Sequence, residues 1–182
     1  MKRRLALLAA LSAAAGLSAC GNGGEVSHAD SEGTSITVGG LQYQVQISRQ
    51  LNPRDLEDRE YLTGVDPVGG RLGNNEVFFA VFLRVKNATS QQQASAGDFT
   101  ITDTIGEQFR PVPVRNTFAY RPQPLAADAT VPNGIEPAAY APTQGKMLLF
   151  KLPNGALDNR PLELEVKSPQ TPQQVGSFNL DV

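Results

Sequence analysis

The stretch that decides the fold is EVFFAVFLRVKN, residues 76–87. Every second residue from Val77 to Val85 is a large aliphatic or aromatic one, and this period of two predicts a β-strand with one face in the core. The intervening residues from Phe78 to Phe82 are apolar as well. We therefore expect a central strand that is covered on both faces near its start.

Outward from this strand, the same alternation recurs along the chain. In LQYQVQIS, residues 41–48, it places Leu41, Tyr43, Val45 and Ile47 on one buried face. Gly39-Gly40 predicts a turn from a short preceding strand. The other expected strands are two around the turn at 104–106 within 98–112, and those at 145–153, 160–166 and 176–182. About seven or eight strands and few helical signals predict an all-β antiparallel sandwich.

One segment, NPRDLEDREYLTG from Asn52, is typical of a short surface helix inside a long connection. Asn52 can cap its start, and the pairs Arg54–Asp58 and Asp55–Arg59 have the i, i+4 spacing of ion pairs. Its carboxylates could also be offered as catalytic acids. The interleaved arginines favour a salt-bridged surface helix.

A long proline-rich loop is expected at residues 111–142, which hold seven of the 13 prolines. A loop of this length is functional or disordered, and proline stiffening favours an ordered one. Its arginine and aromatic side chains form a candidate binding surface: Arg115, Phe118, Tyr120, Arg121 and Tyr140. The alternative is that the aromatic rings tuck under the loop and hold it against the sandwich.

The N-terminal segment predicts export and lipid attachment. MKRR is followed by an apolar run at 5–17 that is too short to span a bilayer, a pattern typical of a secretory signal peptide. Its end, LSAC, resembles the lipobox of bacterial lipoproteins, which implies that Cys20 carries the lipid. We expect a signal peptide at 1–19, a flexible lipidated tether at 20–35 and the folded domain at 36–182.

Charge and metal-ligand content narrow the function classes. Removal of residues 1–19 would leave 13 bases against 18 acids, a net charge of −5, so no nucleic-acid partner is expected. His28, the single histidine, could form a weak metal site with Asp30 and Glu32, but a solvated tether histidine is preferred. Asp98 and Asp103 could suggest calcium, but turn and edge positions explain them better. We expect no metal and no cofactor.

The domain as a whole resembles a family of uncharacterised bacterial lipoproteins with an immunoglobulin-like (telokin-like) extracellular domain. The resemblance rests on LQYQVQIS, VFFAVFLRVKNATS, DFTITDTIGEQFRPV and GKMLLFKLP…LELEV. It implies an immunoglobulin-like sandwich, and it carries no catalytic residues over to this chain. The insertion at 51–75 and the proline-rich loop depart from the family's simplest form.

The function that these features favour is a non-enzymatic binding or interaction module of the cell envelope. It would be held at the extracytoplasmic face of a bacterial membrane by the lipid on Cys20, and its partner would be an envelope protein or a glycan. The alternative is an envelope hydrolase with a carboxylate pair formed on folding. A copper or metal carrier is disfavoured because soft ligands are nearly absent.

Overall fold

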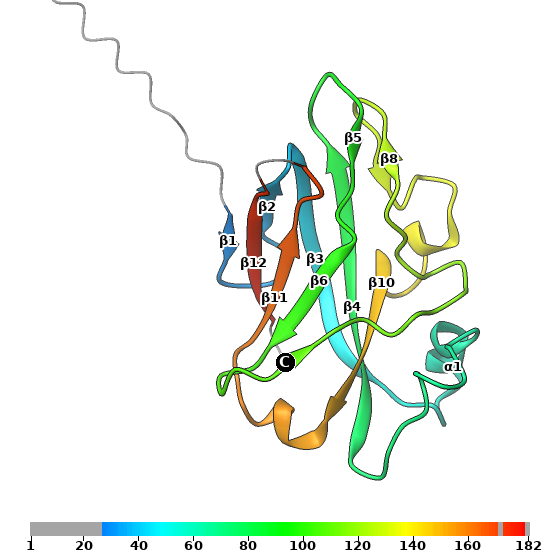
Figure 1. The fold of residues 1–182 in the computed structure, drawn as a ribbon. Coiled ribbons are helices and arrows are strands. Elements are labelled where there is room, and N and C mark those ends of the chain that lie inside the picture. Colours follow the sequence, from blue (N-terminus) through cyan, green and yellow to red (C-terminus); the bar gives the residue numbers. More distant parts are fainter. Residues whose placement is uncertain (1–26, 171–172, 181–182) are drawn as a thin grey trace, which may run out of the picture.

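A computed structural model describes residues 27–170 and 173–180, and two sheets face each other in it (Figure 1). The β4 sheet has the order β10 (Lys146–Pro153), β4 (Glu76–Asn87), β3 (Leu41–Leu51), β2 (Ser35–Val38), with β9 (Thr130–Val131) pairing the end of β4. The β11 sheet has the order β1 (His28–Ala29), β12 (Val175–Leu180), β11 (Leu162–Lys167), β6 (Asp98–Thr102), β7 (Gln108–Phe109). The short strands β5 (Gln93–Ala94) and β8 (Pro124–Leu125) pair with each other.

This architecture confirms the predicted all-β sandwich. All eight expected strands are present, and the described chain adds four strands of two residues each, β1, β5, β8 and β9. The pairing is antiparallel throughout the two sheets except between β1 and β12, which run parallel. Three helical segments complete the described fold: α1 (Leu56–Leu62), η1 (Pro137–Ala139) and η2 (Asn154–Leu157).

The inner core fills the space between the two sheets. From β4 it takes Phe79, Val81 and Leu83, and across the sandwich these face residues such as Phe99 of β6 and Phe178 of β12. All five side chains are at most 2% exposed. Burial of this apolar surface is the main stabilising contribution to a sandwich of this size.

An outer core covers the opposite face of the β4 sheet. Phe78, Ala80 and Phe82 of β4 lie there, under Tyr61 of α1 and under Phe118 of the proline-rich loop. The Tyr61 ring meets the rings of Phe82 and Phe118 edge-on, with centroids 5.1 Å and 4.8 Å apart. The prediction that β4 is covered on both faces is thereby confirmed.

A β-bulge in β3 overturns one sequence prediction. Val45 pairs with Leu83 but Ile47 pairs with Phe82, so Gln46 is an extra residue on this strand. One extra residue moves every later side chain to the opposite face. Ile47 was expected in the core but points outward and is 39% exposed, while Ser48 is buried on the inner side.

The predicted helix forms, but it begins later and makes different ion pairs. Asp55, not Asn52, caps α1, since its carboxylate accepts from the backbone N–H of Glu57 and Asp58. Asp58 is 6% exposed and pairs with Arg49 of β3 at 2.7 Å instead of pairing with Arg54. The helix is therefore docked on the outer core through a buried carboxylate and is not a purely salt-bridged surface helix.

The folded part of the chain begins earlier than the predicted boundary at residue 36. His28 and Ala29 form β1, and the His28 Nδ1 atom lies 2.8 Å from the Ser177 hydroxyl of β12. His28 is thus part of the β11 sheet and not a histidine of a free tether, because pairing with β12 holds it. The predicted signal peptide and Cys20 lie outside the described residues, within which no helix is long and apolar enough to cross a membrane.

Candidate functional site

The proline-rich loop lies along the free edge of β10. The Val112 N–H donates to the Leu149 carbonyl at 2.6 Å, the Met147 N–H donates to Phe118 at 2.7 Å, and the Tyr120 N–H donates to Met147 at 2.8 Å. These bonds satisfy edge groups that would otherwise invite pairing with another chain. The loop is therefore ordered, as proline stiffening predicted.

Asn116 ties this loop to the end of α1, a role that the sequence alone did not reveal. Its side-chain nitrogen donates to the carbonyls of Tyr61 and Thr63, at 2.7 and 2.9 Å. Its side-chain oxygen accepts from the N–H groups of Phe118 and Ala119, each at 2.9 Å. The amide thus satisfies helix-end carbonyls and fixes the turn that follows Arg115.

Two of the three aromatic residues predicted for the binding surface lie beneath the loop. Tyr120 is 9% exposed, its hydroxyl donates to the Ala96 carbonyl at 2.8 Å, and its ring meets Phe99 edge-on at 5.3 Å. Phe118 packs against the outer core. Tyr120 is therefore a core residue and not a surface residue, because the strand-like pairing with β10 turns its side chain inward.

A second tyrosine completes the anchor under the loop. The Ala96 N–H donates to the Tyr43 hydroxyl at 2.7 Å, so Tyr43 and Tyr120 hold the two backbone groups of one residue. Burial raises the pKa of Tyr43 to about 12, against the opposing effect of the hydrogen bond from Ala96. Burial raises the pKa of Tyr120 further, and the neighbouring Tyr43 adds to that rise.

The other three predicted residues are exposed, but only two of them come together. Arg115 and Arg121 line two adjoining hollows, which share these side chains and Ala119. Tyr140 is 73% exposed, donates its hydroxyl to the Gly134 carbonyl and lines neither hollow. We call the combined depression the arginine groove.

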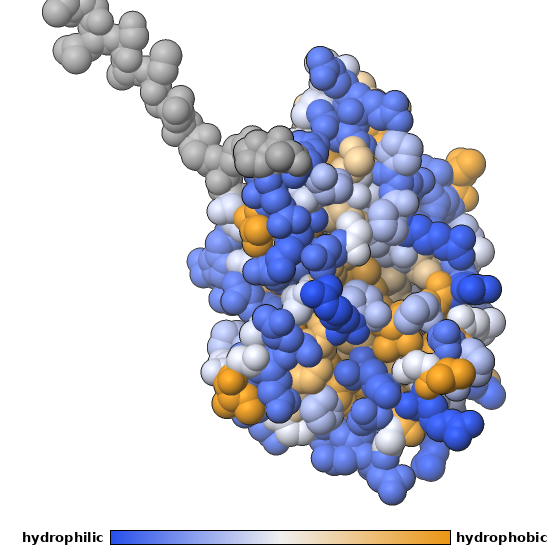
Figure 2. Space-filling model, viewed as in Figure 1, coloured by the Kyte–Doolittle hydropathy of each residue, from blue (hydrophilic) through white to orange (hydrophobic). Residues whose placement is uncertain are grey.

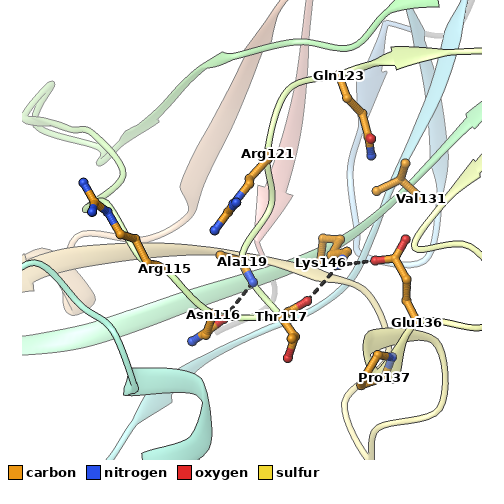
Figure 3. A pocket seen from close by; sticks show the side chains of 10 residues that line it. All are labelled: Arg115, Asn116, Thr117, Ala119, Arg121, Gln123, Val131, Glu136, Pro137 and Lys146. Atoms are coloured by element: carbon orange, nitrogen blue, oxygen red, sulfur yellow. Dashed lines mark hydrogen bonds and ion pairs between the residues drawn. The ribbon is translucent and has the colours of Figure 1, made fainter.

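The first hollow, of about 530 Å³, is lined mainly by polar and charged residues, and we call it the polar hollow (Figure 3). Its lining is Arg115, Asn116, Thr117, Ala119, Arg121, Gln123, Val131, Glu136, Pro137 and Lys146. Lys146 is ion-paired with Glu136 and donates to the Thr117 carbonyl at 2.8 Å, so its charge is neutralised. Within the described chain neither Arg115 nor Arg121 makes an ion pair, although the charge of Arg115 also acts on the Asp66 carboxylate. The lining of the hollow itself therefore carries a positive excess.

The second hollow, of about 700 Å³, is mostly apolar. Phe99, Met147 and Leu149 form parts of its floor, and prolines of the loop form parts of its wall. In Figure 2, hydrophobic side chains reach the surface among hydrophilic ones in the area that the proline-rich loop encloses in Figure 1. An apolar depression next to two guanidinium groups has the general composition of a ligand site.

Other polar clusters of the described chain make no comparable site. His28 lies between Ser177 and Asp30, with its Nε2 atom 3.3 Å from the Asp30 carboxylate. This spacing is that of a nucleophile, a base and an orienting acid, but five of the best-formed hollows in the described part do not include these residues. Their contacts instead hold β1 on β12.

The two carboxylates that the sequence offered for calcium, Asp98 and Asp103, are engaged elsewhere. The Asp98 carboxylate pairs with the Arg110 guanidinium at 2.8 Å. Asp103 sits in the turn before β7 and accepts from the Asn159 side chain and from the backbone of Ile105 and Glu107. Burial acts to raise the pKa of Asp103, but the hydrogen bonds together hold it below its ordinary value.

A general acid needs a raised pKa, but the fold lowers the pKa of each carboxyl group of the described chain that it clearly perturbs. The pKa values of Asp66 and Glu76 are lowered, mainly by backbone N–H donors from Gly69 and Gly73. No group of three or more His, Cys, Asp or Glu side chains that could hold a metal ion occurs in residues 27–170 and 173–180.

Comparisons with known proteins bear on the fold. No protein-family model matches the chain, and no curated protein matches it. The yjhA protein from Bacillus subtilis is similar in structure, with a TM-score of 0.51 at 9% identity over 84% of this chain and 99% of that chain. A functionally unknown protein from Listeria monocytogenes EGD-e has a TM-score of 0.51 at 10% identity, over 84% and 85% of the two chains.

A third structure is more distant. The candidate lipoprotein ycdA from Bacillus subtilis has a TM-score of 0.49 at 10% identity, over 80% of this chain and 38% of that chain. The two structures with a TM-score of 0.51 show a shared fold and nothing about ligands. The function of this chain must therefore be argued from its own groove.

Proposed function

We propose that this protein is a lipid-anchored, extracytoplasmic binding module of a bacterial cell envelope, and that the arginine groove holds its partner. The observation that carries the proposal is a pair of exposed guanidinium groups beside an apolar depression, on a loop that the fold fixes in place. The anchor is the lipid on Cys20, and the partner is an envelope protein or glycan.

The rigidity of the groove supports a binding role. Asn116, Tyr120 and the bonds to β10 fix the backbone on both sides of Arg115 and Arg121. A surface that is ordered before it meets its partner loses less conformational entropy on binding, which raises affinity. In protein interfaces a few residues, arginines among them, commonly contribute most of the binding energy.

The chemistry of the groove favours binding over catalysis. Glu136 is the one carboxylate that lines the described groove, and its partner Lys146 neutralises it. A carboxylate-pair hydrolase needs two acids flanking one bond. The groove offers cations and apolar surface, which recognise a ligand without changing it.

The test is crosslinking in the native envelope, with the full chain carrying a photoreactive residue in place of Thr117. Thr117 is exposed and lines the polar hollow. We expect one recurrent crosslinked partner, lost when both Arg115 and Arg121 are changed to Ala. The matched control is the double change of Arg54 and Arg59 to Ala, which removes the same charge from the exposed side of the helical segment and should leave the crosslink intact.

Two outcomes would contradict the proposal. The same crosslinked product from the Arg115 and Arg121 double variant would show that the groove does not hold the partner. A membrane-bound full chain in which mass spectrometry finds no acyl lipid on Cys20 would show that lipid on Cys20 is not the anchor, since two or three acyl chains are what makes such an anchor stable.

A further inference from the structure

We infer that the occupant of the arginine groove is an acidic peptide segment, in which an apolar side chain lies two residues from a carboxylate. This inference rests on the proposed function and narrows it from a protein or glycan to one chemical class. Its grounds are the charged and apolar side chains of the two hollows, the absence of an exposed aromatic ring from the described lining, and the position of the groove relative to β1.

The charge of the groove selects an anion. Arg115 and Arg121 line both hollows, so these two residues lie where the hollows adjoin. In Figure 3 both lie on one side of the polar hollow, while Glu136 and Pro137 lie on the other. A guanidinium group presents a planar fork of donors that matches a carboxylate, and neither fork is occupied by an acid of the described chain.

The apolar hollow selects a side chain next to that anion. Its floor includes Met147, Leu148 and Leu149 of β10, and its wall includes Pro111, Pro113 and Pro122. Such a surface takes an aliphatic side chain, whereas a wholly polar ligand would leave it uncovered. In an extended peptide, residues i and i+2 face the same side, so a carboxylate and an aliphatic group at this spacing enter the two hollows together.

A sugar chain is the weaker occupant because the groove lacks an exposed aromatic platform. The flat apolar faces of sugar rings stack well on aromatic rings. Phe99 and Tyr120 line the apolar hollow, but they are only 2% and 9% exposed and present no open ring face. Phe118 packs against the outer core, and Tyr140 lies outside the lining of both hollows. The described groove therefore offers guanidinium forks and aliphatic walls, which suit a peptide better.

The anchoring membrane is a less suitable occupant because the groove and the first described strand lie on different sides of the domain. In Figure 1 the described chain starts at β1 on one side of the sandwich, and the proline-rich loop lies on the opposite side. The first described strand and the groove therefore lie on opposite sides of the domain, and this arrangement favours a partner other than the anchoring membrane.

The test is NMR titration of the full chain, solubilised in mild neutral detergent, with defined peptides. The probe is acetyl-Ser-Glu-Ser-Leu-Ser-amide, and its controls replace Glu with Gln or Leu with Ser. We expect saturable shifts of the backbone amides at 112–123 with the probe, and about tenfold weaker binding for each control, since each loses one charged hydrogen bond or one buried aliphatic group.

Variants and competing probes make the result decisive. The Arg115→Ala and Arg121→Ala changes together should abolish the shifts, while the Arg54→Ala and Arg59→Ala double control should keep them. Equal binding of the Gln or Ser control peptide would overturn the inference. Stronger groove shifts with polygalacturonate, an anionic glycan, or with phosphatidylglycerol vesicles would overturn it in favour of those classes.

The failure of this inference can be told apart from a failure of the proposed function. If the envelope crosslink through Thr117 depends on Arg115 and Arg121 but the probe peptide neither shifts the groove amides nor competes, the binding role stands and the peptide class is wrong. If the crosslink itself is independent of the arginines, the proposed function fails as well.

Discussion

Replacing Asn116 with Ala should destabilise the whole domain, because this one side chain connects the proline-rich loop to α1. It donates to the carbonyls of Tyr61 and Thr63 and accepts from the N–H groups of Phe118 and Ala119, all four at 2.9 Å or less. Ala keeps the backbone but removes every one of these bonds. The change therefore measures how much the amide alone contributes.

The magnitude follows from the four contacts. Each hydrogen bond contributes about 1 kcal/mol net, and water replaces part of that where a group is accessible. Asn116 is half-buried, and so we expect its loss to lower the free energy of unfolding by about 2–3 kcal/mol. Asn116→Asp keeps the two accepted bonds but loses both donors and sets a negative charge at the end of a helix, so it should also destabilise.

The assay is urea unfolding followed by far-ultraviolet circular dichroism, with amide hydrogen exchange at Phe118 and Ala119. Asn133→Ala is the matched control, since Asn133 is exposed and accepts one bond, from the Ile135 N–H at 3.1 Å. This control should change stability by less than about 0.5 kcal/mol. An Asn116→Ala chain as stable as the Asn133→Ala chain, with unchanged exchange protection, would refute the reasoning.

Three further predictions concern the supports of the groove and of the turn before β7. Arg49→Met should lower the free energy of unfolding by about 2 kcal/mol in urea titrations, because it leaves the Asp58 carboxylate buried without its cation. The further change Asp58→Asn should restore part of the lost stability, and a double variant with no restored stability would contradict this account. Gly64→Ala should lower the free energy of unfolding more than Gly33→Ala does in the same titrations. Both glycines have a positive φ, +73° and +80°, and a Cβ in this conformation destabilises the fold by about 1–2 kcal/mol. Only at Gly64 would the added Cβ also meet a loop carbonyl oxygen, at 2.5 Å. Because the folded state lowers the pKa of Asp103, its ionised form stabilises the protein above the ordinary value near 3.8, and that stabilisation disappears as pH falls through the lowered pKa. The difference in unfolding free energy between wild type and Asp103→Asn should therefore shrink as pH falls below 3.8, and a constant difference would exclude this role.

The strand pattern of this protein could be predicted from sequence because alternation is a local property. Strands such as β4 and β11 keep their period of two from end to end, and the structure follows it. The bulge at Gln46 could not be predicted in this way, since a single extra residue leaves the apolar spacing of Leu41 to Ile47 unchanged in the sequence. The position of the bulge depends on how β3 pairs with β4.

The candidate site was predictable in its location but not in its details. Proline density indicated an ordered loop, and its arginines proved to be exposed together. Which aromatic rings face inward depends on pairing with β10, a strand more than 25 residues further along the chain. The part played by Asn116 depends on contacts with residues more than 50 positions earlier, and no local pattern reports such contacts.

The bulge in β3 lets one strand serve two cores. Before Gln46 the odd-numbered side chains, Tyr43 and Val45, enter the space between the sheets; after it, Arg49 and Leu51 turn to the outer face, where α1 and the proline-rich loop are docked. One extra residue in β3, Gln46, thus lets the same strand complete the sandwich and also support the outer layer of α1 and the proline-rich loop. The odd-numbered positions of β3 are consequently under separate constraints, which the sandwich sets before the bulge and the outer core sets after it.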